Sequence, residues 1–133
     1  MTDDNNGVLL LSSTEAERKL QDYEREGWRV FRLPIGITSK KSFFEAVRGV
    51  MPLDPPIKSN RSWEALADSL WEGLMSLREK RIVVLWPSYG QMREKDPEAF
   101  AIASSIMRQL VSTLCAPEIT SQSVKQVVVI QVT

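Results

Sequence analysis

The chain has 133 residues, enough for one domain with a hydrophobic core and too few for two comfortable ones. Its 17 basic residues balance 17 acidic ones, so no overall charge attracts nucleic acid or an anionic membrane. There is no histidine, which removes the usual general base and the commonest metal ligand, so we expect neither catalytic residues nor a metal or other cofactor.

A strand and a helix are expected at the N-terminus. Val8 to Leu11 is a short apolar run that suits a strand. Thr14 fits the N-cap of a helix, because Glu17 three residues later completes a capping box. We interpret residues 1–27 as an N-terminal β-α addition to a core of residues 28–133, all within a single domain.

A second strand, a second helix and a loop follow. Trp28 to Leu33 alternates apolar residues with arginines, which is typical of a strand. Ser39 is a candidate N-cap for a helix whose apolar residues have helical spacing: Phe43, Phe44, Val47 and Val50. The segment 51–60 contains three prolines, so it is neither helix nor central strand. We predict a stiff loop there, of the length that often carries function.

The next elements are a helix and a fully apolar strand. Ser62 is expected to cap a helix over Trp63 to Leu77. Ile82 to Trp86 is nearly all apolar, which suits a strand covered on both faces. The segment Pro87 to Gly90 is expected to break that strand.

The last third predicts one long helix and one strand. Asp96 and Pro97 provide an N-cap and a first-turn proline for a helix that ends near Leu114. Residues 116–123 are interpreted as a polar connector, and residues 125–132 as the final strand.

Strands separated by helices predict an α/β fold, a three-layer-like small domain with a central parallel sheet packed by helices. Three strands are expected, near 28–33, 82–86 and 125–132. Val8 to Leu11 is a candidate fourth strand at one edge.

The helix that begins at Trp63 carries an acidic stripe. Glu64, Asp68 and Glu72 recur every four residues and therefore stack along one side of the helix. No lysine or arginine lies between Arg61 and Arg78 to neutralise them. Trp71, at the border of the stripe, is either an interface anchor or the rim of the core. A solvated helix face is the structural alternative to a binding surface.

The sequence Trp63-Glu64-Ala65-Leu66-Ala67-Asp68-Ser69-Leu70 resembles the [LW]-D-A-L-W-D-x-L helix of the barstar family of ribonuclease inhibitors. The order of elements around it, including a strand that ends in tryptophan, is similar as well, so that the resemblance covers roughly Trp28 to Val132. It implies a barstar-like fold and an inhibitor or immunity protein that blocks the active site of a basic, secreted or toxin-type ribonuclease.

By position, the resemblance implies that Glu64 and Asp68 meet the basic phosphate-binding site of the enzyme. The full set of candidate partner-binding residues is Glu64, Asp68, Trp71, Glu72, Ala67, Asn60 and Ser62. The chain departs from the family pattern at Ala67, where tryptophan is usual, and at Leu85, where glutamate is usual. Lys58 and Arg61 also add positive charge beside the stripe.

Three other functions fit parts of the sequence. A barstar-fold interaction module could bind a protein that is not a nuclease, through the same helix or through Trp86, Tyr89 and the loop after them. An enzyme could use Glu64 and Asp68 as acid and base. Direct nucleic-acid binding would depend on the basic cluster at residues 78–81, which more plausibly complements a helix dipole.

The N-terminus and the lone cysteine bear on where the protein works. The four-residue run Val8 to Leu11 is far short of a signal sequence or a membrane span. A single cysteine, Cys115, excludes an internal disulfide and suits a reducing compartment. We therefore expect a cytoplasmic protein, a monomer when free, with no membrane and no nucleic-acid partner.

Overall fold

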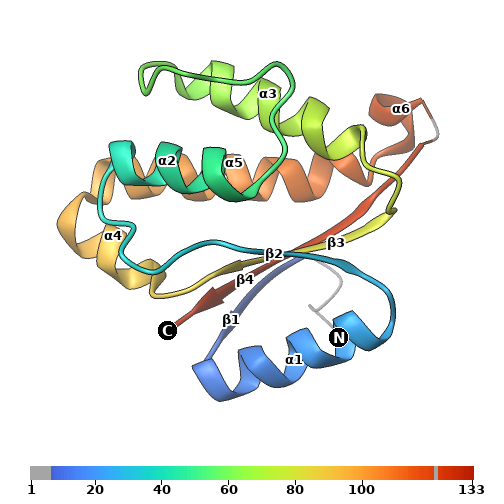
Figure 1. Cartoon of the computed structure of the whole chain (residues 1–133), viewed down its shortest axis with the longest axis horizontal. Coiled ribbons are helices and arrows are strands. Elements are labelled where there is room, and N and C mark those ends of the chain that lie inside the picture. Colours follow the sequence, from blue (N-terminus) through green and yellow to red (C-terminus); the bar gives the residue numbers. More distant parts are fainter. Residues whose placement is uncertain (1–6, 122) are drawn as a thin grey trace.

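The computed structural model of the chain describes residues 7–121 and 123–133. In chain order the elements are β1 (Val8–Leu11), α1 (Ser13–Arg25), β2 (Arg29–Arg32), α2 (Lys40–Val50), α3 (Trp63–Met75), β3 (Arg81–Trp86), α4 (Tyr89–Lys95), α5 (Pro97–Leu114), α6 (Pro117–Thr120) and β4 (Gln126–Val132). The four strands form one parallel sheet in the order β1-β4-β3-β2 (Figure 1). The predicted parallel sheet is confirmed, and residues 8–11 add its fourth strand at one edge.

The sheet separates two apolar cores. One core lies between the sheet and α2, α3 and α5, with α4 at the carboxyl end of β3, and includes Phe43, Phe44 and Trp86 (Figure 1). The other lies under α1 alone and includes Leu20 and Ile130. The central strands β3 and β4 are buried on both faces, which explains their almost continuous apolar sequences. The result is a three-layer α/β arrangement.

The helix α1 begins two residues earlier than the sequence indicates. Ser12, not Thr14, is the N-cap, and its hydroxyl accepts from the backbone N–H of Glu15, whose carboxylate accepts from the backbone N–H of Ser12. Two overlapping capping-box patterns exist in this segment. The structure uses the first, and the carboxylate of Glu17 instead pairs with Arg32 of β2, at 3.3 Å. The expectation that Thr14 caps the helix is therefore wrong.

Two short helices were not expected from the sequence. The segment after β3, interpreted as a strand break, continues into the two-turn helix α4, and the polar connector contains the single turn α6. Helices this short have too few residues for apolar periodicity to reveal them. Within the described residues, no helix is long and apolar enough to cross a membrane.

Lys125 is a buried cation that holds the connection between α3 and β3. It is 5% exposed, and its Nζ donates to the carbonyl oxygens of Leu77 and Glu79, each at 2.6 Å. Burial lowers the pKa of the Lys125 ammonium, and the nearby carboxylate of Glu79 acts in the opposite direction. The side chain therefore supplies a donor to two backbone acceptors just before the chain enters the sheet.

Replacing Lys125 with methionine should destabilise the fold, because it keeps the aliphatic chain but removes the donor from both carbonyl groups. We expect a loss of about 1–3 kcal/mol in the free energy of unfolding near neutral pH. Urea denaturation would measure it, with the exposed Lys41→Met as control. Equal stability of the two variants would contradict this role of Lys125.

The same variant tests the pKa of Lys125. The folded chain releases this proton at lower pH than the unfolded chain, so the stability of the wild type should rise as the pH increases through the lowered pKa toward the ordinary value of 10.5. The difference between wild type and Lys125→Met should therefore widen over that interval.

Candidate protein-binding surface

The faces of α3 are used in four different ways. Ser62 accepts a hydrogen bond from the backbone N–H of Ala65 at 3.0 Å and starts the helix, as predicted. At about 100° per residue, the positions fall into four sides. In order around the helix these are a core side with Leu66, Leu70 and Leu74, a side with Trp63, Ala67 and Trp71, the acidic side with Glu64, Asp68 and Glu72, and a side with Ser69 and Gly73.

The proline-rich loop lies directly on the fourth of these sides. The backbone N–H of Asp54 donates to the carbonyl oxygen of Ser69 at 3.0 Å, and the hydroxyl of Ser69 donates to the carbonyl oxygen of Pro55. A Cβ atom at Gly73 would lie only 2.1 Å from the carbonyl oxygen of Pro52. The loop backbone therefore crosses α3 where the helix has no side chain, and we call this contact the loop crossing.

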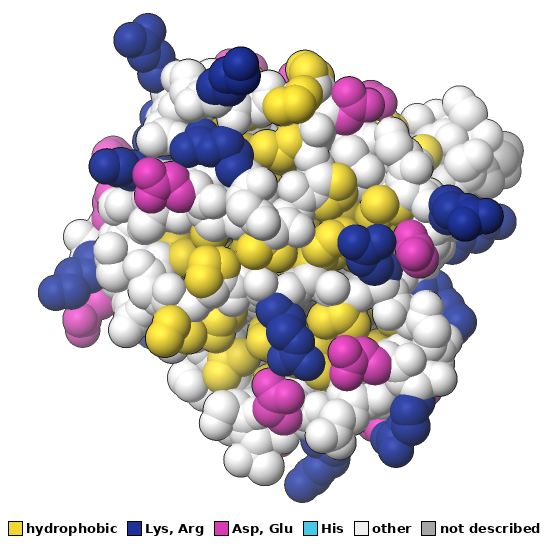
Figure 2. Space-filling model, viewed as in Figure 1, with side chains coloured by type: hydrophobic (Ala, Val, Ile, Leu, Met, Phe, Trp, Pro, Cys, Tyr) yellow, Lys and Arg dark blue, Asp and Glu magenta, His cyan; other side chains and the backbone are white. Residues whose placement is uncertain are grey.

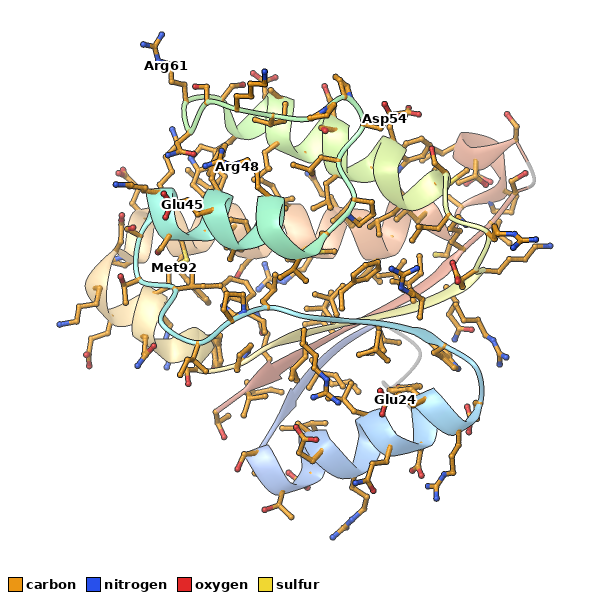
Figure 3. All side chains as sticks on the ribbon, viewed as in Figure 1. Glu24, Glu45, Arg48, Asp54, Arg61 and Met92 are labelled. Atoms are coloured by element: carbon orange, nitrogen blue, oxygen red, sulfur yellow. The ribbon has the colours of Figure 1, made fainter. Side chains whose placement is uncertain are left out.

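The end of the loop is held by two basic side chains of α2. Lys40 Nζ donates to the carbonyl oxygen of Arg61 at 2.6 Å, and Arg48 Nη1 donates to that of Ser59 at 3.5 Å. Basic side chains gather over this end of the molecule in Figure 2, and Arg61 itself points away from the protein in Figure 3. The loop is thus fixed at both ends, on α3 and on α2.

The acidic side of α3 is exposed, as the sequence predicts. Glu64, Asp68 and Glu72 are all exposed, and none of them forms an ion pair with another residue in the described ranges. Like charges at this spacing cost a few tenths of a kcal/mol per pair. The stripe is therefore a concentration of negative charge that the described part of the chain does not neutralise.

Of three other candidate residues, Trp71 and Ser62 form hydrogen bonds within the described part of the fold and the side-chain oxygen of Asn60 does not. Trp71 is half-buried, and its indole N–H donates to the hydroxyl of Thr113 in α5 at 3.0 Å. The hydroxyl of Ser62 is the cap of α3. The side-chain oxygen of Asn60 is buried with no hydrogen-bond partner in the described part of the chain. The structure thus brings Glu64, Asp68 and Glu72 together on one open surface and ties Trp71 and Ser62 into the scaffold beside it.

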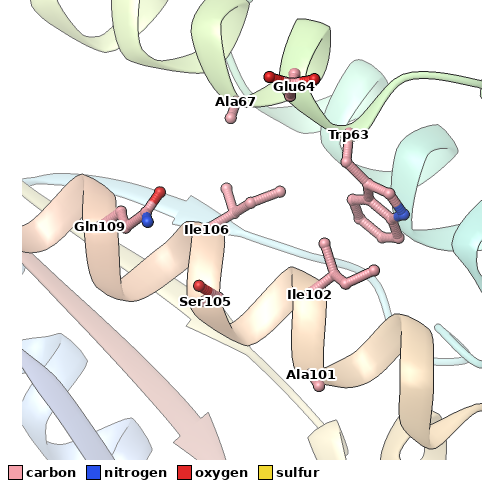
Figure 4. Close-up of a pocket in the computed structure, with 8 residues that line it drawn as sticks. All are labelled: Trp63, Glu64, Ala67, Ala101, Ile102, Ser105, Ile106 and Gln109. Atoms are coloured by element: carbon pink, nitrogen blue, oxygen red, sulfur yellow. The ribbon is translucent and has the colours of Figure 1, made fainter.

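A groove between α3 and α5 adjoins the acidic side. It consists of two hollows of about 360 and 280 Å³ that share Ala67, Ile106 and Gln109. In Figure 4, Trp63 and Ala67 point down from α3, and Ile102 and Ile106 point up from α5. We call this the α3–α5 groove.

Only the α3 wall of this groove was among the candidates from the sequence. The α5 wall is distant in the sequence, and the packing of two helices is not encoded in local patterns. In the structure this wall is marked by Ile102, a large apolar residue of α5 that remains 37% exposed.

Trp86 and Tyr89 themselves are not available as a binding surface. Trp86 is 0% exposed and packs against the rings of Phe43 and Phe100, with centroid separations of 5.4 and 5.7 Å. Tyr89 is 7% exposed, at the start of α4. These rings belong to the core, so the expectation that they offer a second interface is wrong.

The family model for barstar, the barnase inhibitor, matches residues 28–131 of the chain. Comparisons with curated proteins and with solved structures give no match. The matched range begins after α1, so β1 and α1 lie outside it, while α3, the loop before it and α5 lie within it.

Substituting Gly73 tests the loop crossing. Gly73→Ala places a methyl group against the backbone of Pro52, and we expect a loss of stability of about 1–3 kcal/mol or more. Gly49→Ala is the matched control, because that glycine also lies in a helix but has open space around it. It should stabilise the chain by about 0.5–1 kcal/mol. Thermal unfolding of both variants would decide, and a Gly73→Ala variant as stable as wild type would exclude the close crossing.

The hydrogen bond between α3 and α5 can be measured by a double-mutant cycle. Trp71→Phe, Thr113→Val and the double variant should show a coupling of about 0.5–1.5 kcal/mol in unfolding free energy. Additive effects of the two single changes would mean that the indole does not join the two helices.

Proposed function

Because the chain belongs to the barstar family, we propose that it is an immunity protein, which binds and blocks the active site of a basic ribonuclease-type toxin through α3 and the loop before it. The family-level role is inhibition of barnase-type ribonucleases. Members of this family are inhibitors rather than enzymes. We therefore propose that the chain has no catalytic residues of its own.

The observation that carries this proposal is the unneutralised acidic side of α3 beside a loop that is fixed at both ends. A ribonuclease active site is built to hold phosphate groups with cationic side chains. Carboxylates on a rigid helix can occupy those positions without first being ordered, so little conformational entropy is lost on binding. The acidic side is open for such a contact, since neither the loop nor α5 covers it.

We propose that Glu64 and Asp68 make the principal contacts with the enzyme's cationic groups. Ala67, Trp71 and Glu72 would contribute to the surrounding surface, and Ser62 and Asn60 would support it from the end of the loop. Lys58 and Arg61 are exposed beside this surface. They weaken the local negative potential, so recognition depends on close pairs at α3 rather than on long-range attraction.

The wider setting follows from the same proposal. An inhibitor that protects its own cell acts in the cytoplasm, as one half of a toxin–antitoxin pair. The lone cysteine suits that compartment. We propose that the free chain is a monomer, that it needs no cofactor, and that neither nucleic acid nor a membrane is its partner.

A second function retains the fold and changes the partner. The residues at positions 67 and 85 differ from the usual family residues, and Leu85 lies in the second core, 7% exposed. These differences favour a protein-interaction module whose partner is not a nuclease. An RNA-cleavage assay distinguishes the two functions. Barnase and several related ribonucleases are each mixed with an equimolar amount of the chain, and their remaining activity is measured. Inhibition of any of them supports the proposed function, and full activity of all of them supports the module.

Removing the charge of Asp68 should weaken binding much more than folding. Exposed ion pairs are worth about 0–1 kcal/mol to stability. Truncating one partner of a buried charge pair at an interface costs about 2–5 kcal/mol, a range drawn from interfaces that include barnase–barstar itself. We expect Asp68→Ala and Asp68→Asn to unfold at nearly the wild-type temperature and to bind the inhibited ribonuclease far more weakly, as calorimetric titration at low and moderate salt would show.

Glu94→Ala is the matched control, since Glu94 is an exposed carboxylate that lies on α4 and not on the proposed binding surface of α3. It should change neither binding nor stability. If Asp68→Ala binds like wild type at both salt concentrations, α3 is not the inhibitory surface.

A further inference from the structure

The α3–α5 groove has a largely apolar lining and is large enough for a side chain. Its larger hollow, of about 360 Å³, lies at the lower end of the range of about 300–1,000 Å³ found for ligand pockets. Trp63 and Ile102 face each other across one end, and Ala67 and Ile106 form the middle (Figure 4). A groove of this shape accommodates one large apolar side chain between the two helices.

The groove is open because α3 contributes little volume at its centre. Ala67 presents only a methyl group there, and it is half-buried. Ile106 is 6% exposed and forms the floor, whereas Ile102 is 37% exposed on the α5 wall. A group that covers Ile102 would therefore remove apolar surface from water, which is the main favourable term in protein association.

The charged side chains that line the groove are acidic, and a basic group lies just outside the lining, where Lys40 Nζ sits 5.6 Å from the ring centre of Trp63. Among the residues that the structure describes, those that line its two hollows include two carboxylates, Glu64 and Asp68, and no lysine or arginine. Neither carboxylate has an ion-pair partner in the described ranges of the chain. A complementary ligand must therefore combine an apolar group with a cation close beside it. A second copy of this chain would instead bring its own acidic rim against this one.

We propose that the α3–α5 groove binds a leucine- or phenylalanine-like side chain of the inhibited protein, which stands next to an arginine or lysine that pairs with Glu64 or Asp68. This inference rests on the proposed function and adds the chemistry of the surface that the partner presents. The acidic side of α3 then selects for positive charge, and the groove beside it selects for an adjacent apolar residue.

Short peptides can test the groove without knowledge of the partner. The probes are the acetylated amides Phe-Arg and Leu-Arg, with Gly-Arg and Phe-Glu as controls, titrated at millimolar concentration into the isotope-labelled full chain. We expect saturable NMR shifts of the Ile102 and Ile106 methyl groups and of the Trp63 indole with the first two. Gly-Arg should bind about tenfold more weakly or worse, because it lacks the apolar side chain. Phe-Glu should bind at least about two- to fivefold more weakly, because it loses one exposed ion pair and brings a further carboxylate close to Glu64 and Asp68.

Two variants locate the response. Ala67→Trp fills the groove and should abolish the shifts, and Ile102→Ser removes one apolar wall at an exposed position and should weaken binding several-fold. Ile35→Ser is the matched control, because Ile35 is 77% exposed and does not line the groove. Thermal unfolding establishes that each variant is folded, and Ile102→Ser remains informative if Ala67→Trp does not fold.

The proposal is overturned if the peptides cause no saturable shift, if all four bind alike, or if the shifts lie outside the groove. A dimer detected by analytical ultracentrifugation would also overturn the proposal if Ile102→Ser dissociates it, because the groove would then bind a second copy of the chain.

Inhibition assays distinguish failure of the groove proposal from failure of the proposed function. If the chain inhibits a ribonuclease and the folded Ala67→Trp variant inhibits it equally, the groove proposal alone is wrong. If the peptides bind as expected but no ribonuclease is inhibited, the proposed function alone is wrong.

Discussion

The crossing of the loop backbone over α3 at Gly73 is the constraint on which the rest of this surface depends. With no side chain at that position, the carbonyl group of Pro52 can approach the helix, and the two hydrogen bonds at Ser69 then fix the loop along it. One side of α3 is thereby covered by the loop and the next by the core. The acidic side and the side that faces α5 are covered by neither the loop nor the core, and these two sides form the proposed binding surface.

The same constraint explains why the surface is rigid. Trp71 joins α3 to Thr113 of α5, and Lys40 and Arg48 of α2 hold the end of the loop. The helix that presents Glu64 and Asp68 is therefore fixed by contacts on three sides, none of which uses a carboxylate of the stripe. Charge that is free of intramolecular partners and held on a fixed scaffold is the arrangement that electrostatic recognition of a basic cleft requires.

The N-terminal unit has a different role. The helix α1 covers the face of the sheet opposite α3, and Arg32 of β2 ties it down through Glu17 and Glu24, at 3.3 and 3.9 Å. We propose that residues 1–27 belong to the same domain as the barstar-like core of residues 28–133, because without α1 one face of β3 and β4 would be open to water.

Local signals in the sequence were sufficient for most of the fold. Ser39, Ser62 and Asp96 were identified as caps because a cap is decided within three residues, and each accepts the hydrogen bond that defines it. The expectation for Thr14 was wrong because two capping-box patterns overlap in this segment, and local sequence alone does not distinguish them. The exposure of Glu64, Asp68 and Glu72 could also be predicted, from helical spacing and the lack of nearby cations.

What the sequence could not provide was the relation between segments far apart in the chain. The burial of Trp86 and Tyr89 depends on packing partners in α2 and α5, and the groove depends on the alignment of α3 with α5. Ser69 and Gly73 were not distinguished from other small helical residues, because only the path of the loop reveals their use.

Hydrogen–deuterium exchange of the full chain, alone and bound to a ribonuclease that it inhibits, would show whether α3 and the α3–α5 groove form the binding surface. We expect new protection in peptides that cover the end of the loop and α3, residues 57–72, and the α5 wall of the groove, residues 101–109. Peptides from α1 should be unchanged, since that helix lies on the opposite face of the sheet. Protection confined to α1 and β1, with α3 unchanged, would contradict this expectation.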